Sequence, residues 1–342
     1  MNLKTIIICA VLEIAMVSPA TPSETPLASA REYVMGTIAE LRVYAASSPE
    51  AARAALETAL AEIRTVDRLM AVQRPDSDLS RLNREGARGP VGVDPRVVTV
   101  IAASLAVSRL SDGAFDVTVL PVVRAWGFTD GRPRRPEPRS AARIAGYRSV
   151  VVDAQAGTVS FTDPATQVDL GGIAKGYALD QARDLMRRAG VRSAWLDLGG
   201  QIATLGSPPE GGSWRIALRH PRGDDAPLGV IEIGEASVST SGDREQFVES
   251  AGQRFGHIID PHTREPAEGL LSATVVHGSA MQADALSTAA AVGDLATAEA
   301  LLARAGASGV LVSRADDDRL DVHVTPGLTY RPAPDTEMEV TS

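Results

Sequence analysis

Apolar side chains recur at helical spacing in the first third of the chain. After Ser48-Pro49, residues such as Leu56 and Ile63 fall on one face of a helix. A hydroxyl residue followed by proline is typical of a helix start. Asp94-Pro95 opens a second stretch of the same kind. The pattern therefore predicts two amphipathic helices, separated by a polar loop over 73–92.

The rest of the chain mixes short alternating runs with further helical stretches. We predict helices over 175–189, 282–292 and 295–305, and strands over 32–45, 149–153, 158–162, 167–170, 194–198, 214–219, 230–233, 237–240, 272–277 and 309–312. Strands and helices do not alternate regularly, which favours an α+β fold over a doubly wound parallel sheet. A proline- and arginine-rich stretch over 131–140 is expected to be an exposed connector.

Composition narrows the class of protein further. With 342 residues, 44% hydrophobic and 23% charged, the chain can fill a core, so overall disorder is excluded. The net charge of −9 argues against a nucleic-acid binder, which would show a basic face. Aromatic residues make up only 4%, which also argues against base stacking. Cys9 is the single cysteine, which excludes a disulfide scaffold and a cysteine-rich metal site.

The N-terminus resembles a secretory signal. Lys4 precedes an apolar run over 5–17, interrupted by Glu13, and Ser18-Pro19-Ala20 follows. A buried N-terminal helix or a misassigned start codon is the alternative. No later stretch is apolar enough to predict a membrane span. We therefore expect export to the periplasm or beyond, with a signal peptide (1–20), a disordered leader (21–31), one two-lobed domain (32–332) and a flexible tail (333–342).

Common nucleotide-binding loops are missing from the sequence, so any such site must be built differently. There is neither a P-loop nor a G-x-G-x-x-G after a strand. The stretch D-L-G-G-I-A-K-G-Y-A (169–178) runs from a predicted strand through Gly171-Gly172 into a helix that begins near Lys175. Glycines and helix N-terminal amides suit a phosphate. An ordinary strand–helix turn with an exposed lysine is the alternative.

Oxygen-bearing side chains gather on a second predicted helix. Asp284 and Thr288 are four residues apart on one face, with Ser287 beside them. Such ligands suit Mg²⁺, which takes few protein oxygens together with phosphate oxygens. The alternative is an aspartate stabilised by the helix dipole and a threonine bonded to its own backbone.

Three further segments contain candidate functional residues. S-T-S-G-D (239–243) is a polar turn after a strand, and H-I-I-D-P (257–261) contains a titratable histidine. His257 could act as a general base, or it could be structural. Asp260 before Pro261 is expected to form a turn. In D-G-A-F-D-V-T-V (112–119), polar residues either face a ligand or belong to a half-buried strand.

Together these segments, in this order, resemble the ApbE-type FAD:protein FMN transferase family. The resemblance covers about 33–312, nearly the whole chain after the expected leader. Its matching stretches are Met35-Gly36-Thr37, R-P-D-S-D-L-S-R-L-N (74–83), G-A-F-D-V-T-V (113–119), D-L-G-G-I-A-K-G-Y-A (169–178), L-D-L-G-G (196–200), S-T-S-G-D (239–243), H-I-I-D-P (257–261) and A-D-A-L-S-T (283–288).

The resemblance implies a bilobal, T-fold-like α+β protein with mixed or antiparallel sheets, packed helices, and FAD between its lobes. The family uses Mg²⁺ to transfer the FMN moiety of FAD to a Thr or Ser hydroxyl of an acceptor protein, and AMP leaves. Carried over by motif, the resemblance implies a metal site made of Gly172 (through its carbonyl), Asp284, Ser287 and Thr288. It implies that the residues that line FAD are Met35, Gln73, Ala114, Phe115, Asp116, Asp169, Lys175 and Ile259. It places His257 and Asp243 near the reacting phosphate.

Two positions depart from the family pattern. Gln73 stands where the family commonly has an aromatic residue, and it cannot stack equally well on a flavin or adenine ring. Gly172 stands where alanine is frequent, which matters little for a main-chain ligand. Three other functions stay open: an FAD pyrophosphatase that gives FMN and AMP, a periplasmic flavin carrier, and a structural or adhesion module.

Overall fold

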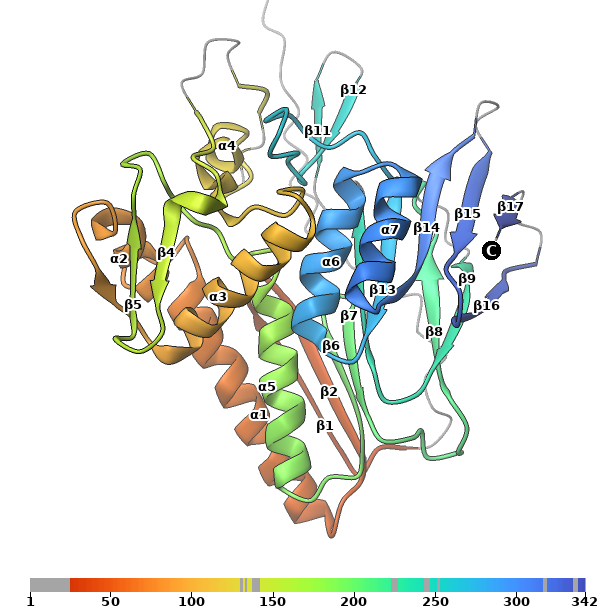
Figure 1. The fold of residues 1–342 in the computed structure, drawn as a ribbon. Coiled ribbons are helices and arrows are strands. Elements are labelled where there is room, and N and C mark those ends of the chain that lie inside the picture. Colours follow the sequence, from red (N-terminus) through yellow and green to blue (C-terminus); the bar gives the residue numbers. More distant parts are fainter. Residues whose placement is uncertain are drawn as a thin grey trace, which may run out of the picture.

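A computed structural model of the chain describes residues 25–129, 132, 134–136, 142–222, 227–242, 247–250, 253–315, 319–334 and 338–341. Within these residues the fold is built on a nine-stranded sheet (Figure 1). Its order is β1 (Ala28–Val34), β2 (Thr37–Ala45), β6 (Ser193–Leu198), β7 (Gln201–Leu205), β10 (Ser237–Gly242), β13 (Ser272–His277), β14 (Ser308–Arg314), β15 (Leu320–Val324) and β17 (Met338–Thr341). Neighbouring strands are antiparallel except β15 and β17, which are parallel.

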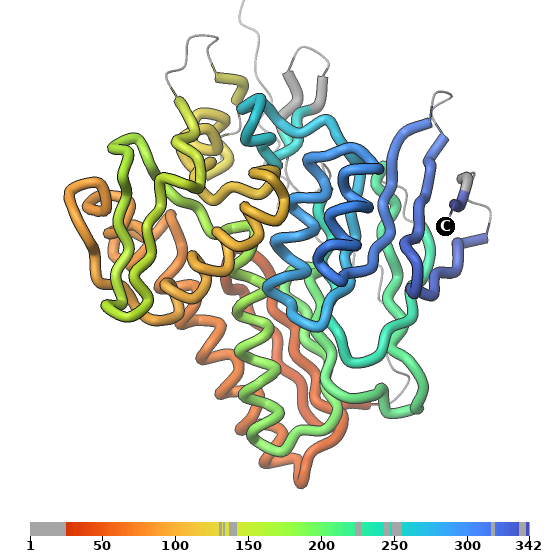
Figure 2. Tube along the Cα trace, in the orientation of Figure 1, coloured from red at the N-terminus to blue at the C-terminus, as the bar shows by residue number. Residues whose placement is uncertain are grey.

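Helices cover one face of this sheet. They are α1 (Pro49–Met70), α5 (Ala174–Arg188), α6 (Ala280–Val292) and α7 (Leu295–Ala305). Helix α3 (Pro95–Leu110) packs against α1, α6 and α7. The tube view shows the β1–β2 hairpin passing behind α5 (Figure 2). Alternate residues of β6, such as Leu196, point into the same apolar core as Ile63 of α1 and Leu179 of α5. Burial of this core is the main driving force for the layered arrangement.

The opposite face of the sheet is covered by a small second sheet. Its three strands are β8 (Trp214–Arg219), β9 (Pro227–Ile233) and β16 (Thr329–Pro332), in the order β16-β9-β8. Trp195 of β6 lies between the layers, with its ring centroid 5.7 Å from that of Trp214. The strands of the main sheet therefore bury side chains on both faces.

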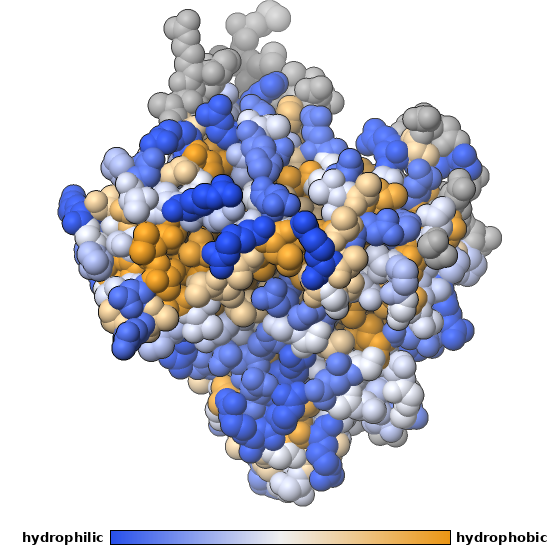
Figure 3. All heavy atoms as spheres, viewed as in Figure 1, coloured by the Kyte–Doolittle hydropathy of each residue, from blue (hydrophilic) through white to orange (hydrophobic). Residues whose placement is uncertain are grey.

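A smaller group of elements lies beside the helical layer. It contains α2 (Asp78–Glu85), α4 (Leu120–Ala125), the three-stranded sheet of β3 (Val91–Gly92), β5 (Thr158–Phe161) and β4 (Val150–Asp153), and two 3-10 turns (Val117–Val119 and Tyr147–Ser149). The hairpin of β11 (Phe247–Ser250) and β12 (Gln253–Gly256) stands close to α4 (Figure 1). In the space-filling view, polar side chains dominate the tip formed by α1 and α5 (Figure 3).

The α+β prediction is confirmed, and so are the two N-terminal helix starts. The Ser48 side chain caps α1 and the Asp94 side chain caps α3. Within the described part of the chain, the helices are too short or too polar to span a membrane.

Several predicted boundaries were wrong. The stretch 32–45 is a hairpin with a turn at Met35-Gly36, because both residues adopt positive φ. The predicted loop 73–92 contains α2, which begins at the Ser77 cap. The stretch 112–119 ends in a 3-10 turn, and 167–170 is not a strand.

The chain ends also differ from the expectation. β1 begins at Ala28, inside the expected leader of 21–31, and its residues alternate between more and less buried positions. β17 occupies part of the expected flexible tail, where backbone pairing with β15 fixes it. The expected signal peptide, 1–20, lies outside the described residues.

Candidate functional site

The turn before α5 is held in place by side chains rather than by a strand. The Asn83 amide spans the backbone of Val168: its nitrogen donates to the Val168 carbonyl (2.9 Å), and its oxygen accepts from the Val168 N–H (2.7 Å). Asp169 Oδ1 accepts from the Gly171 N–H at 2.8 Å. Burial raises the pKa of the Asp169 carboxyl, against the opposing effects of that hydrogen bond and of Lys175. The turn is thereby fixed in one conformation.

The N-terminus of α5 has no side-chain cap, because Ile173 occupies the cap position. Two amides of the first turn already have partners, because the Ala174 N–H donates to the Leu170 carbonyl (2.9 Å) and the Gly176 N–H donates to Asp284 Oδ2 (3.0 Å). The helix dipole still favours an anion at this end. Lys175, in the first turn, adds a positive charge. The phosphate cradle expected of the stretch 169–178 stays a prediction, and the stretch follows an irregular segment rather than a strand.

Helix α6 brings the predicted metal ligands to this turn. Asp284 is buried, and its Oδ2 accepts from the Gly176 N–H at 3.0 Å. A Cβ added to Gly172 would come within 3.1 Å of Thr288 Oγ1 and 3.3 Å of the Phe115 ring. Gly172, Phe115 and Thr288 therefore meet in the folded chain, although they are far apart in the sequence.

The donor atoms at this meeting point suit a hard cation. They comprise the buried carboxylate of Asp284 and the hydroxyl of Thr288, one helical turn apart on α6. Thr288 Oγ1 donates to the Asp284 carbonyl (3.1 Å), so its lone pairs can face a ligand. No group of three or more His, Cys, Asp or Glu side chains forms a metal cluster among the described residues. Oxygen donors with a single carboxylate fit Mg²⁺, which keeps water and phosphate oxygens in its coordination shell.

The Ser287 hydroxyl is bonded to strand β10. Its side chain is fully buried, and its hydroxyl contacts Ser239 Oγ (3.1 Å), Ser241 Oγ (2.9 Å) and the Asp284 carbonyl (2.9 Å). Ser287 therefore links α6 to β10. Ser241, at 3.5 Å from Thr288 Oγ1, is the β10 residue nearest the predicted ligands.

Asp116 has a structural role in the loop that carries Ala114 and Phe115. Its Oδ1 accepts from the Thr118 N–H (2.8 Å) and hydroxyl (2.7 Å), and its Oδ2 accepts from the Tyr147 N–H (2.8 Å). Burial raises the pKa of this carboxyl, and the three hydrogen bonds oppose the shift. Asp116 thus fixes the walls of the site, while Ala114 and Phe115 lie on the side of Gly172.

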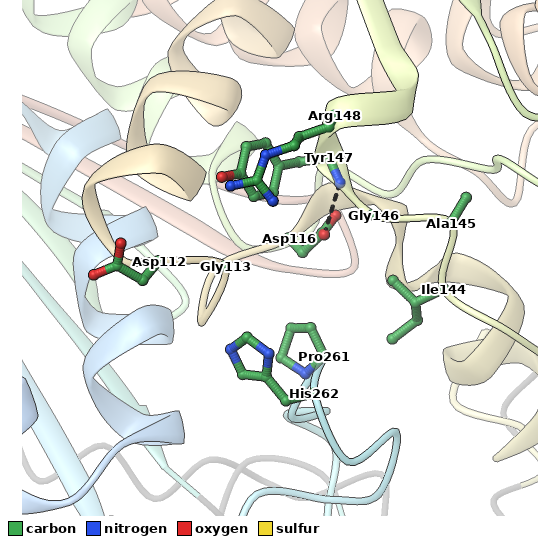
Figure 4. A pocket seen from close by; sticks show the side chains of 10 residues that line it. All are labelled: Asp112, Gly113, Asp116, Ile144, Ala145, Gly146, Tyr147, Arg148, Pro261 and His262. Atoms are coloured by element: carbon green, nitrogen blue, oxygen red, sulfur yellow. Dashed lines mark hydrogen bonds between the residues drawn. The ribbon is translucent and has the colours of Figure 1, made fainter.

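A pocket of about 280 Å³ opens beside this loop (Figure 4). Ile144 and Pro261 form apolar walls, and the His262 ring lies against Gly113, 3.4 Å from the position of an added Cβ. The Arg148 guanidinium lies 4.8 Å from the centre of the Tyr147 ring. Sequence reasoning missed His262, Tyr147 and Arg148, because only the folding of three distant loops brings them together.

The H-I-I-D-P segment lies beside α4. His257 is partly exposed, and its ring is edge-on to Phe128 at 6.4 Å. The Ile259 side chain is buried in a small cluster with Val122 and Trp126, which leaves its main chain as the group able to face a ligand. Asp260 accepts from the His262 N–H (2.8 Å), as expected of a turn. Asp243 lies outside the described residues.

Met35 and Gln73 lie at the ends of other elements. Met35 has a φ of 53°, which is uncommon for a residue with a side chain and is often found at functional sites. Gln73 is exposed just beyond the end of α1. The roles of Met35 and Gln73 in lining FAD stay predictions from the family pattern.

Known proteins resemble this chain over most of its length. A family model described as the ApbE family matches residues 35–311. A relative from Vibrio cholerae, an FAD:protein FMN transferase, is 35% identical over 226 residues, covering 64% of this chain and 67% of its own. A relative of the same name from Salmonella typhimurium is 29% identical and covers 87% of each chain. The crystal structure of the ApbE protein from Thermotoga maritima superposes with a TM-score of 0.77 at 30% identity, covering 90% of this chain and 97% of that one.

Proposed function

The chain belongs to the ApbE family, and we propose that it is an FAD:protein FMN transferase with Mg²⁺ as its metal. It cleaves the pyrophosphate of FAD, joins the FMN phosphate to a Thr or Ser hydroxyl of an acceptor protein, and releases AMP. The observation that carries the proposal is the juxtaposition of Gly172, at the turn before α5, with Thr288 on α6, one turn beyond buried Asp284.

Residues of α5 and α6 would together hold the pyrophosphate of FAD. Asp284, Thr288 and the Gly172 carbonyl would hold Mg²⁺, which offsets the charge on the phosphate oxygens and on the departing AMP when it is bound. The dipole at the N-terminus of α5 and the charge of Lys175 would stabilise the negative charge of the phosphates. The donors are fixed before the substrate arrives, so little reorganisation accompanies the reaction.

The acceptor hydroxyl must lose a proton during transfer. A new bond forms between its oxygen and the FMN phosphorus as the bond from that phosphorus to the bridging oxygen breaks. AMP leaves with that oxygen, and the proton passes to a base. His257 and Asp243 are the proposed bases; His257 is partly exposed, as contact with an acceptor protein requires.

The proposal is tested by the intact mass of an acceptor. The purified chain is incubated with FAD, Mg²⁺ and a flavin-acceptor domain, and we expect the domain to gain the mass of one FMN, with no gain when EDTA is present. Release of AMP and free FMN without an adduct would establish a pyrophosphatase instead. Tight FAD binding without turnover, with several acceptors, would establish a carrier.

We propose further that the chain is exported after removal of residues 1–20. The positive start, the apolar run and the small residues near Ala20 support this location. Expression of the full chain in a Gram-negative host should yield periplasmic protein that begins near residue 21. A protein that stays in the cytoplasm with Met1 intact would contradict export without affecting the proposed activity.

A further inference from the structure

The N-terminus of α6 is fastened to α5 by one carboxylate. Asp180, in the second turn of α5, accepts from the Ser279 hydroxyl (2.6 Å) and from the N–H groups of Ala280 (2.8 Å) and Met281 (3.0 Å). Ser279 in turn accepts from the Gln282 N–H at 3.3 Å. The N–H groups of Ala280, Met281 and Gln282 thus all have a partner, and two of them donate to the same residue of another helix, Asp180 of α5.

Arg183 forms an ion pair with the Asp180 carboxylate. The Arg183 side chain is buried, and its Nη2 donates to Asp180 Oδ1 (2.8 Å) and to the Gly278 carbonyl (2.8 Å). Its Nη1 donates to the Ser237 hydroxyl at 3.1 Å. The ion pair therefore joins α5, the start of β10 and the loop that leads into α6.

A second contact between the same helices lies one turn away on each. Gly176 is four residues before Asp180, and Asp284 is four residues after Ala280; the Gly176 N–H donates to Asp284 Oδ2 at 3.0 Å. The helices are very close here, because a Cβ on Gly176 would lie 2.2 Å from the Ala280 carbonyl oxygen. Two contacts one turn apart fix both the axial position and the rotation of α6 relative to α5.

We propose that Asp180, held by Arg183, is a positioning residue for the metal site. It sets where Asp284 and Thr288 lie relative to Gly172 at the start of α5. The inference rests on the proposed function, because it assigns Asp180 a role only if those residues bind the metal. Groups that orient metal ligands commonly change metal affinity by 10- to 100-fold when they are removed.

The chain offers a matched control on the same helix. Asp184 forms an i,i+3 ion pair with Arg187, as Asp180 does with Arg183, but its side chain is 45% exposed and belongs to the solvent-facing side of α5. Asp180→Asn and Asp184→Asn therefore remove the same charge from the same helix. Only the first weakens the contact with α6.

The test measures metal binding separately from turnover. Mn²⁺ is titrated into the FAD-saturated protein without acceptor, and free Mn²⁺ is followed by electron paramagnetic resonance; the Mg²⁺ dependence of transfer is measured in parallel. For Asp180→Asn we expect the Mn²⁺ dissociation constant and the half-saturating Mg²⁺ concentration to rise about 10-fold or more. We expect kcat to recover largely at saturating metal, and Asp184→Asn to match the unmodified protein.

Wild-type metal binding in Asp180→Asn, with only a lower free energy of unfolding in urea, would overturn the proposal and leave Asp180 as a helix cap. If that variant does not fold, Ser279→Ala replaces it: it removes one of the three donors that the start of α6 provides to Asp180, and an unchanged Mn²⁺ affinity would likewise overturn the proposal. A wild-type protein that binds no Mn²⁺ would instead contradict the proposed metal site itself.

Discussion

The aspartates of this chain differ mainly in what surrounds them. Asp116 is occupied by three hydrogen bonds within its own loop, and Asp180 by the N-terminus of α6. Asp284 is buried beside a hydroxyl and a glycine turn, where a cation and a phosphate can approach. Because the environment decides whether a carboxylate supports structure or binds a ligand, substitutions at these positions should have different effects.

Asp284→Asn should abolish FMN transfer while the protein remains folded. The amide keeps an oxygen that can accept from the Gly176 N–H, but it lacks the negative charge that a divalent cation needs at a site with one carboxylate. We expect transfer to fall by at least 100-fold, on the order of 3 kcal/mol in activation free energy. Asp294→Asn, at the exposed cap of α7, is the control in the mass assay; near-normal transfer by Asp284→Asn with Mg²⁺ would contradict the metal assignment.

Asp197 should make the protein less stable as the pH rises toward neutrality. Burial, together with the charge of Glu40 directly opposite on β2, raises the pKa of Asp197 from an ordinary value of 3.8 to about 6. Between these two values the native state binds more protons than the unfolded state, so the free energy of unfolding falls as the pH rises through this window. Above pH 6 the destabilisation is complete, on the order of 3 kcal/mol.

The comparison with Asp197→Asn isolates this effect. Asparagine retains an oxygen able to accept from the Gly200 N–H, as Asp197 does at 2.7 Å, but it carries no charge. In urea unfolding we expect the variant to be more stable than the unmodified protein at pH 8, by on the order of 1–3 kcal/mol, and similar to it near pH 4. Equal stabilities at pH 8 would mean that water solvates the native carboxylate well enough to remove the burial cost.

At the scale of elements, local sequence signals placed helices more accurately than strands. The caps at Ser48 and Asp94 predicted where α1 and α3 begin, and the periodic apolar positions after them predicted that both are helices. The β1–β2 turn was missed because Met35 adopts a positive φ that its residue type does not indicate. The short strands β16 and β17 were missed because their stability depends on pairing with β9 and β15, which are distant in the sequence.

The two glycines of the β6–β7 turn should tolerate alanine unequally. Both have positive φ (68° at Gly199 and 87° at Gly200), which costs alanine about 1–2 kcal/mol. A Cβ on Gly200 meets nothing within 4 Å, whereas one on Gly199 would lie 2.4 Å from Thr37 Oγ1 in the neighbouring hairpin. We therefore expect Gly199→Ala to be more destabilising in urea unfolding, by about 1–3 kcal/mol beyond Gly200→Ala.

A double variant tests the cause of this difference. Adding Thr37→Ala to Gly199→Ala removes the two atoms that the new Cβ approaches most closely, so the additional loss should largely disappear. If the two single glycine variants have equal free energies of unfolding, the Thr37 side chain can change its rotamer without loss of stability. The packing of Thr37 against the β6–β7 turn would then contribute less to stability than its geometry indicates.

At the scale of the whole molecule, the site joins parts that fold from distant segments. The 113–116 loop, the turn before α5 and helix α6 each contribute to it.

FAD and Mg²⁺ together should therefore stabilise the native state, by about 2.7 kcal/mol at a ligand concentration 100 times the dissociation constant. Thermal unfolding should show this increase with both ligands, and much less with FAD and EDTA. Asp284→Asn should lack the metal-dependent part, and an increase that persists in EDTA would show that FAD binds without the metal.

The sequence by itself determined the fold class, the main helices and the family, because caps, periodicity and ordered motifs are local properties of the chain. It also placed Asp284, Thr288 and the Gly171-Gly172 turn among the candidate ligands. Only the tertiary structure decided which candidates meet: Gly172 lies against Thr288, Ser287 turns toward β10, and Asp116 serves its own loop. Asp180 was absent from the candidates because its partners lie about 100 residues away, and such contacts arise only when α5 and α6 pack together.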